Sequence, residues 1–131
     1  MKNERIELFI YVNVINKSKA TYGLYLKYYD KNNLFVMDKK VSSQIIQYKK
    51  IEEVVYNSLI EGLKLIKNRN VQVIVYSSFD GSYKRQDELT KLVKKFYKIN
   101  FIFNYEDEVA KLISKENFIK LDNKGGIILW S

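Results

Sequence analysis

The chain has 131 residues, 47% apolar and 29% charged, which is the balance of one folded domain rather than of a disordered segment. It contains no Cys and no His, which excludes disulfide bonds, thiolate metal sites and His-dependent catalytic triads. No apolar run reaches the roughly 18 residues of a membrane-spanning helix, so we expect a soluble, cytoplasmic protein with no membrane partner.

The net charge of +8 permits an acidic partner such as nucleic acid but does not establish one. Nearly all of the positive charge comes from Lys. Arg, the better residue for bidentate contacts with phosphate, occurs only at Arg5, Arg69 and Arg85. Lys, Asn, Ile and Tyr are abundant together, as an AT-rich coding sequence would produce. The Lys content is therefore weak support for any one function.

The first third of the chain predicts three strands. Residues 7–13, 21–29 and 34–41 are rich in β-branched and aromatic side chains. Turn sequences separate them, at residues 16–19 and 30–33. Short turns between strands favour an antiparallel meander.

After residue 50 the pattern changes to alternating helices and strands. Apolar residues recur at three- and four-residue spacing from Ile51 to Ile66, which predicts an amphipathic helix. Residues 71–76 predict a strand buried on both faces, and residues 99–103 predict another. A helix near residues 89–96 joins these two strands, which makes them parallel neighbours, and a short last helix is expected around residues 109–113.

This β-β-β-α-β-α-β-α order resembles the topology of ribonuclease H, and four segments resemble the bacterial type 1 enzymes. Residues 56–63 (YNSLIEGL) resemble the family's Y-E-A-L-I-A-G-L helix. Residues 10–13 (IYVN) lie where the family has a strand ending in Asp-Gly, and residues 75–78 (VYSS) where it has one ending in Thr-Asp-Ser. Residues 81–84 (GSYK) resemble its G-x-Y-K segment. The resemblance implies a five-stranded mixed sheet in a ribonuclease H-like α/β fold.

The enzymes of this family hold two Mg²⁺ ions between four carboxylates, which clamp the attacking and leaving oxygens of a phosphodiester. The four matching positions here are Asn13, Val55, Ser77 and Ala110. A shift of register does not supply an acid, because there is none in residues 11–16 or 71–78. We therefore expect no catalytic residue, no bound metal and no cofactor. Four acids are left as candidates for residual metal binding: Glu52, Asp80, Asp107 and Glu108. Glu52 lies one turn before Val55 on the same predicted helix face.

Two sets of side chains are candidates for contact with nucleic acid. Aromatic side chains on a sheet stack on bases in single-strand binders, but on a central meander they are more often core or cross-strand pairs. We favour the second interpretation for Phe9, Tyr11, Tyr22, Tyr25, Tyr28 and Tyr29. The candidates for phosphate contact are Lys39, Lys40, Lys49, Lys50, Tyr83, Lys84 and Arg85. For any one pair of Lys residues, a solvated surface is the better explanation.

Residues 117–131 form an expected extension to a ribonuclease H-like domain at residues 1–116. The turn sequence at residues 122–126 (DNKGG) separates two apolar stretches and predicts a β-hairpin or an edge strand. The last apolar residues need burial on their own domain or in an interface with a second copy, and they are Ile127, Ile128, Leu129 and Trp130.

Three functions are open at this point. The first is a catalytically inactive ribonuclease H-like domain that binds nucleic acid, such as an RNA/DNA hybrid or a duplex, or that serves a nucleic-acid pathway. The second is a structural or interaction module that forms a homodimer through residues 117–131. The third is a residual Mg²⁺-dependent ribonuclease that uses displaced acids. Salt dependence separates the first two, because phosphate contacts weaken steeply with salt and apolar contacts do not.

Overall fold

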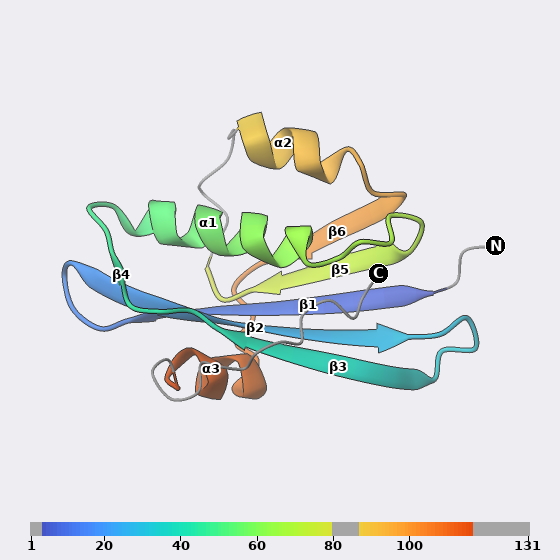
Figure 1. The fold of residues 1–131 in the computed structure, drawn as a ribbon, viewed down its shortest axis with the longest axis horizontal. Coiled ribbons are helices and arrows are strands. Elements are labelled where there is room, and N and C mark those ends of the chain that lie inside the picture. Colours follow the sequence, from blue (N-terminus) through green and yellow to red (C-terminus); the bar gives the residue numbers. More distant parts are fainter. Residues whose placement is uncertain (1–3, 80–86, 117–131) are drawn as a thin grey trace.

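The structure is a computed structural model that describes residues 4–79 and 87–116, and its centre is a mixed sheet with helices on both faces (Figure 1). The strands are β1 (Arg5–Val14), β2 (Lys19–Tyr29), β3 (Phe35–Ser42), β4 (Ile46–Gln47), β5 (Gln72–Ser77) and β6 (Lys98–Ile102). The helices are α1 (Ile51–Lys64), α2 (Asp87–Val93) and α3 (Glu108–Ser114). The strand order is β3-β2-β1-β5-β6, with β4 paired to β2.

The sheet combines an antiparallel half with a parallel half. Strands β1, β2 and β3 pair antiparallel, whereas β5 and β6 run parallel to β1. Phe9 on β1 faces Tyr25 on β2 and Tyr76 on β5, so these three side chains point to the same side of the sheet. In the order β3-β2-β1-β5-β6, β1 is the central strand, and it pairs with the antiparallel half on one side and the parallel half on the other.

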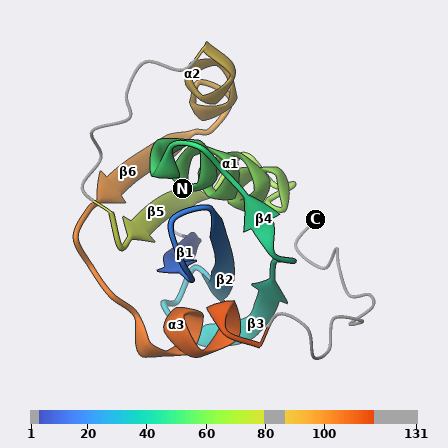
Figure 2. The ribbon, with the colours of Figure 1, turned by 90° about the vertical axis from the view of Figure 1, so that its left-hand side faces the viewer.

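The two faces of the sheet are covered differently (Figure 2). Helices α1 and α2 lie over one face, here called the α1 face, and α3 lies over part of the other, the α3 face. On β1 the α1 face carries Ile6, Leu8, Ile10 and Val12, each at most 4% exposed. The main core lies there, and Gly62 of α1 comes so close to the sheet that a Cβ would lie 2.8 Å from Leu8 Cδ2.

The predicted order of strands and helices is confirmed. The short strand β4 was not predicted, because two residues give no alternating pattern. The first helix ends at Lys64 rather than at Ile66, although Ile66 is fully buried and its backbone N–H donates to the Leu63 oxygen in a loose last turn. The second helix ends at Val93, short of the predicted Phe96.

Of the helices in the described ranges, none has the length and apolar character needed to cross a bilayer. The predicted hairpin or edge strand at residues 117–131, with Ile127, Ile128, Leu129 and Trp130, lies outside the described residues.

Candidate functional site

The candidate site lies where β5 ends beside the middle of β1. The last pair of these strands joins Ile10 to Ser77, and β1 continues beyond it. Ser78 then returns to β1: its N–H donates to the Ile10 oxygen (3.1 Å), and its Oγ accepts from the Val12 N–H (3.2 Å). The Tyr105 N–H donates to the Ser77 oxygen (3.0 Å). The end of β5 is thus tied to two other segments by hydrogen bonds.

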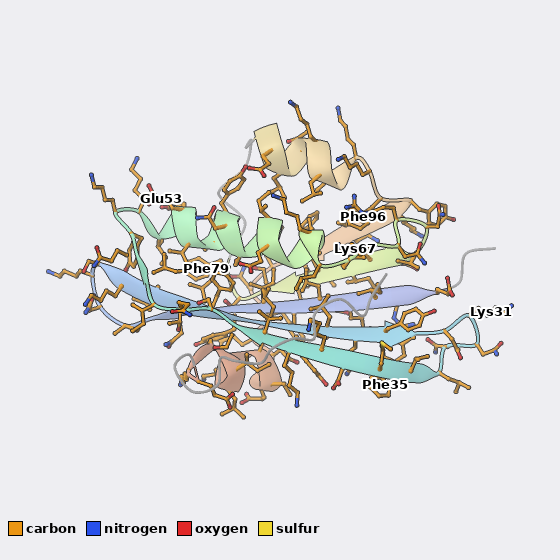
Figure 3. The ribbon with its side chains drawn as sticks, in the orientation of Figure 1. Lys31, Phe35, Glu53, Lys67, Phe79 and Phe96 are labelled. Carbon is orange, nitrogen blue, oxygen red and sulfur yellow. The ribbon has the colours of Figure 1, made fainter. Side chains whose placement is uncertain are left out.

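Two of the four positions that the sequence resemblance assigns to family carboxylates lie on the α1 face. Ser77 is 1% exposed, and its Oγ accepts a hydrogen bond from the Phe79 N–H (3.2 Å), which shapes the turn after β5. Val55 is 1% exposed and belongs to the main core under α1. Phe79 lies between α1 and the sheet (Figure 3). All three side chains serve packing or turn geometry.

The other two positions lie on the α3 face. The Asn13 Nδ2 donates to Thr21 Oγ1 (3.3 Å), and the Thr21 hydroxyl donates to the Ser114 oxygen (2.5 Å). Ala110 is fully buried against β2, where Gly23 leaves room for the helix backbone. Asn13 therefore belongs to a chain of hydrogen bonds that holds α3 on the sheet.

Two solved structures share this arrangement of strands and helices. The RNase H1 of the halophilic archaeon Halobacterium salinarum NRC-1 aligns with a TM-score of 0.51 and 9% identity, over 86% of this chain and 97% of its own. The N-terminal RNase H domain of a Mycobacterium tuberculosis protein, solved as a fusion with maltose-binding protein, aligns with a TM-score of 0.54 and 15% identity, over 86% and 92%. The fold is ribonuclease H-like.

The predicted fold class is confirmed by this likeness, which at such low identity concerns the fold alone. No protein-family profile matches the sequence, and no curated protein matches it either.

The side chains present do not fit the pair of Mg²⁺ ions that this fold implies. Val55 and Ala110 have no polar side-chain atom, and Asn13 and Ser77 bring oxygen atoms without charge. Within residues 4–79 and 87–116, no three acidic, His or Cys side chains gather closely enough to hold a metal ion.

The displaced acids occur at the start of two different helices. Glu52 is exposed in the first turn of α1, whereas Val55, one turn later, is buried. Asp107 is the N-cap of α3, where its Oδ2 accepts from the backbone N–H groups of Val109 (3.1 Å) and Ala110 (3.0 Å). Glu108 is exposed at the start of α3, and Asp80 lies outside the described residues.

Two of the predicted phosphate contacts, Lys39 and Lys40, lie on opposite faces of the sheet. Neighbours on a strand point to opposite faces, so Lys39 lies on the α1 face and Lys40 on the α3 face. Burial lowers the pKa of the Lys39 ammonium. Lys49 and Lys50 are exposed just before α1. The remaining candidates, Tyr83, Lys84 and Arg85, lie outside the described residues.

The aromatic residues of the meander also divide between the faces. Tyr22 is buried on the α1 face and donates its hydroxyl hydrogen bond to the Glu61 carboxylate. Burial, together with this hydrogen bond and the charge of Glu61, raises the pKa of Tyr22. Tyr28 lies on the same face, where the hydrogen bond to Glu4 and burial raise its pKa to about 12. These two side chains have the structural role that the sequence favours.

On the α3 face, four rings from four segments form what we call the aromatic platform: Phe9, Tyr25, Tyr76 and Tyr105. Phe9 is its floor, at 6% exposure, with ring centroids 4.6 Å from Tyr76 and 6.0 Å from both Tyr25 and Tyr105. The Tyr76 and Tyr105 centroids lie 4.9 Å apart. Sequence reasoning missed Tyr76 and Tyr105, because their places depend on the pairing of β1 with β5 and on the loop after β6.

The loop after β6 positions Tyr105 through an unusual backbone conformation. Asn104 has a φ of 61°, in the left-handed region that Asn tolerates better than most residues with a side chain. The Asn104 N–H donates to the Phe79 oxygen (3.0 Å), which holds this turn beside the end of β5. Tyr105 is 43% exposed, so one side of the platform is open to solvent.

Proposed function

We propose that this chain is a nucleic-acid-binding domain of ribonuclease H-like fold that does not cleave its ligand. The absence of cleavage is inferred from the four positions that the sequence resemblance assigns to metal-binding carboxylates. Each holds a side chain without charge that packs in the core or fixes a turn or helix, as described for Asn13, Val55, Ser77 and Ala110. Two-metal hydrolysis requires anionic oxygen ligands, and none of these four positions supplies one.

Binding is supported by charge and by the kind of side chain on the α3 face. The chain carries a net charge of +8, which favours association with a polyanion. The aromatic platform presents ring surface beside lysines, and rings of this kind contact bases in other folds. Neither feature requires a metal ion. Recognition without hydrolysis is the activity consistent with both.

Cleavage and binding are tested separately. Purified protein is incubated with a labelled RNA/DNA hybrid in Mg²⁺ and in Mn²⁺, and we expect no product. Because a host ribonuclease could contaminate the preparation, Asp107→Asn is purified in parallel. Metal-dependent cleavage by the wild-type chain that disappears in Asp107→Asn would contradict the inactive assignment.

Binding is measured by fluorescence anisotropy of labelled hybrid, duplex and single-stranded oligonucleotides over a range of salt concentrations. The logarithm of the affinity should fall linearly with the logarithm of the salt concentration, with a slope equivalent to several released counterions. No detectable binding at low salt would contradict the nucleic-acid assignment. An interaction module with a protein partner would then explain the fold better.

A further inference from the structure

Part of the α3 face carries no helix among the described residues. Helix α3 lies over one end of β1 and β2, near Asn13 and Gly23, and the strands continue beyond it without a covering helix (Figure 1). The aromatic platform lies on this stretch, which no helix within residues 4–79 and 87–116 covers. Phe35, the first residue of β3, pairs with Tyr29 at the end of β2 (Figure 3). The two ring centroids are 6.0 Å apart, and Phe35 is 54% exposed.

Cationic side chains lie against these rings. The Lys27 Nζ is 5.7 Å from the ring centroid of Phe9, 5.8 Å from that of Tyr25 and 5.9 Å from that of Tyr29. The Lys40 Nζ is 6.0 Å from the Tyr25 centroid. Lys27 thus lies among three rings, and Lys40 lies beside one of them. Rings can stack on the bases of a nucleic acid, and lysines can contact its phosphates.

Two acids lie on this stretch of the α3 face. Glu7 forms an ion pair with Arg5 (3.0 Å), and Asp38 accepts a hydrogen bond from the Tyr25 hydroxyl (2.9 Å). In the part of the chain that the structure describes, neither Lys27 nor Lys40 has a carboxylate within salt-bridge distance. Glu7 and Asp38 lie directly across from Lys27 on β1 and β3 and balance part of its charge, whereas Lys40 lies across from Tyr25. Lys40 is therefore the cation on this stretch that is better placed to meet a phosphate.

We propose that the aromatic platform, together with Lys27 and Lys40, is a binding site for single-stranded nucleic acid. This site rests on the proposed function, because it names the form of nucleic acid that the chain binds. Stacking on protein rings requires bases whose flat surfaces are accessible, and a duplex hides these surfaces. The platform crosses β2, β1 and β5, roughly 10 Å at a strand spacing of about 4.8 Å, which is room for two or three bases.

Tyr105 provides the sharpest test, because its ring is exposed and lies in a loop rather than in the sheet. Affinity for a labelled single-stranded 15-mer is measured by anisotropy for the full chain. We expect Tyr105→Leu, which keeps apolar volume but removes the flat ring, to weaken binding about 5- to 100-fold. Tyr105→Phe keeps the ring and should bind within about twofold of the wild type. Tyr97→Leu is the matched control, since Tyr97 is 57% exposed but is not part of the platform.

The cations are tested through the salt dependence of the same measurement. Lys40→Gln should reduce the slope of log affinity against log salt by about 0.7, the value for one phosphate contact of a single strand. Lys67→Gln, an exposed lysine outside the platform (Figure 3), should leave the slope unchanged.

The outcomes separate this site from the proposed function. If the chain binds a hybrid or a duplex and Tyr105→Leu binds every oligonucleotide as the wild type does, the platform proposal is wrong and the proposed function stands. If no nucleic acid binds, both are wrong. If the wild type cleaves a hybrid while Tyr105→Leu loses single-strand affinity, the platform stands and the inactive assignment fails. A drop in stability or dissociation of a dimer in Tyr105→Leu, with unchanged affinity, would assign this face to residues 117–131 or to a second copy and overturn the proposal.

Discussion

Replacing Gly23 with Ala tests how closely α3 is held against the sheet. A Cβ at this position would lie 2.4 Å from the Ala110 oxygen and 2.6 Å from the Ser114 nitrogen. Both atoms belong to the helix backbone, so a side-chain rotation cannot relieve the contact. To restore a separation of about 3.5 Å, α3 must move outward by about 1 Å.

The expected cost follows from that movement. Overpacking of a core by one methyl group destabilises by about 1–3 kcal/mol, and a rigid neighbour places Gly23→Ala at the upper end. Moving α3 also strains the hydrogen bond from the Thr21 hydroxyl to the Ser114 oxygen, which contributes about 1 kcal/mol. We therefore expect the free energy of unfolding to fall by about 3–4 kcal/mol.

Gly62→Ala is the matched comparison. Its Cβ would meet only the end of the Leu8 side chain, at 2.8 Å from Cδ2 and 3.2 Å from Cδ1, and the end of a side chain can shift more readily than a backbone can move. Ala also favours the interior of a helix over Gly by about 1 kcal/mol. The two terms oppose each other, so the net change should stay within about 1 kcal/mol.

Urea unfolding followed by far-ultraviolet circular dichroism measures both variants against the wild type. Hydrogen exchange of the α3 amides adds a local measurement, and protection there should fall in Gly23→Ala but not in Gly62→Ala. If Gly23→Ala loses no more stability than Gly62→Ala, α3 is not packed on β2 at the distance described, and the reasoning from backbone contact is refuted.

Two further predictions use the same unfolding measurement. The raised pKa of Tyr22 means that the stability contributed by its protonated hydroxyl is complete below about pH 10 and is lost as the pH rises above that value. Between about pH 8 and pH 11 the wild type should therefore lose more stability than Tyr22→Phe, and equal losses would argue against a protonated, buried hydroxyl. Asp107→Ala should lower the free energy of unfolding by about 1 kcal/mol through loss of the α3 cap, whereas Asp107→Asn should lower it less. Equal losses in the two variants would show that capping is not the role of Asp107.

Much of the fold is encoded in short-range patterns. The β-branched and aromatic side chains of β1 and the three- and four-residue spacing of apolar residues in α1 predict those elements directly. The absence of acids from residues 11–16 and 71–78, where the two central strands end, is also plain from the sequence, because no nearby register of pairing brings one in. These features depend on neighbours in the chain and need no knowledge of distant contacts.

The site depends on contacts that such patterns do not contain. Tyr76 and Tyr105 join Phe9 only through the register of β1 with β5 and the left-handed turn at Asn104. The position of Glu52 shows a second limit. A spacing of three residues turns a helix by about 300°, so Glu52 and Val55 differ by about 60° in direction, enough for one to be exposed and the other buried.

The central position of β1 sets the order in which the sheet can be completed during synthesis. Its pairing with β2 needs only a short turn, and hairpins form in microseconds, so the meander can assemble as soon as residue 42 is available. The other edge of β1 must wait for β5, which ends at Ser77. At about 5–20 residues per second, the intervening 77 − 42 = 35 residues take roughly 2–7 seconds to synthesise. During that interval, the edge of β1 that will pair with β5 has no partner strand. Helix α1 is synthesised before β5, so it is available to cover the apolar face of β1 during that time.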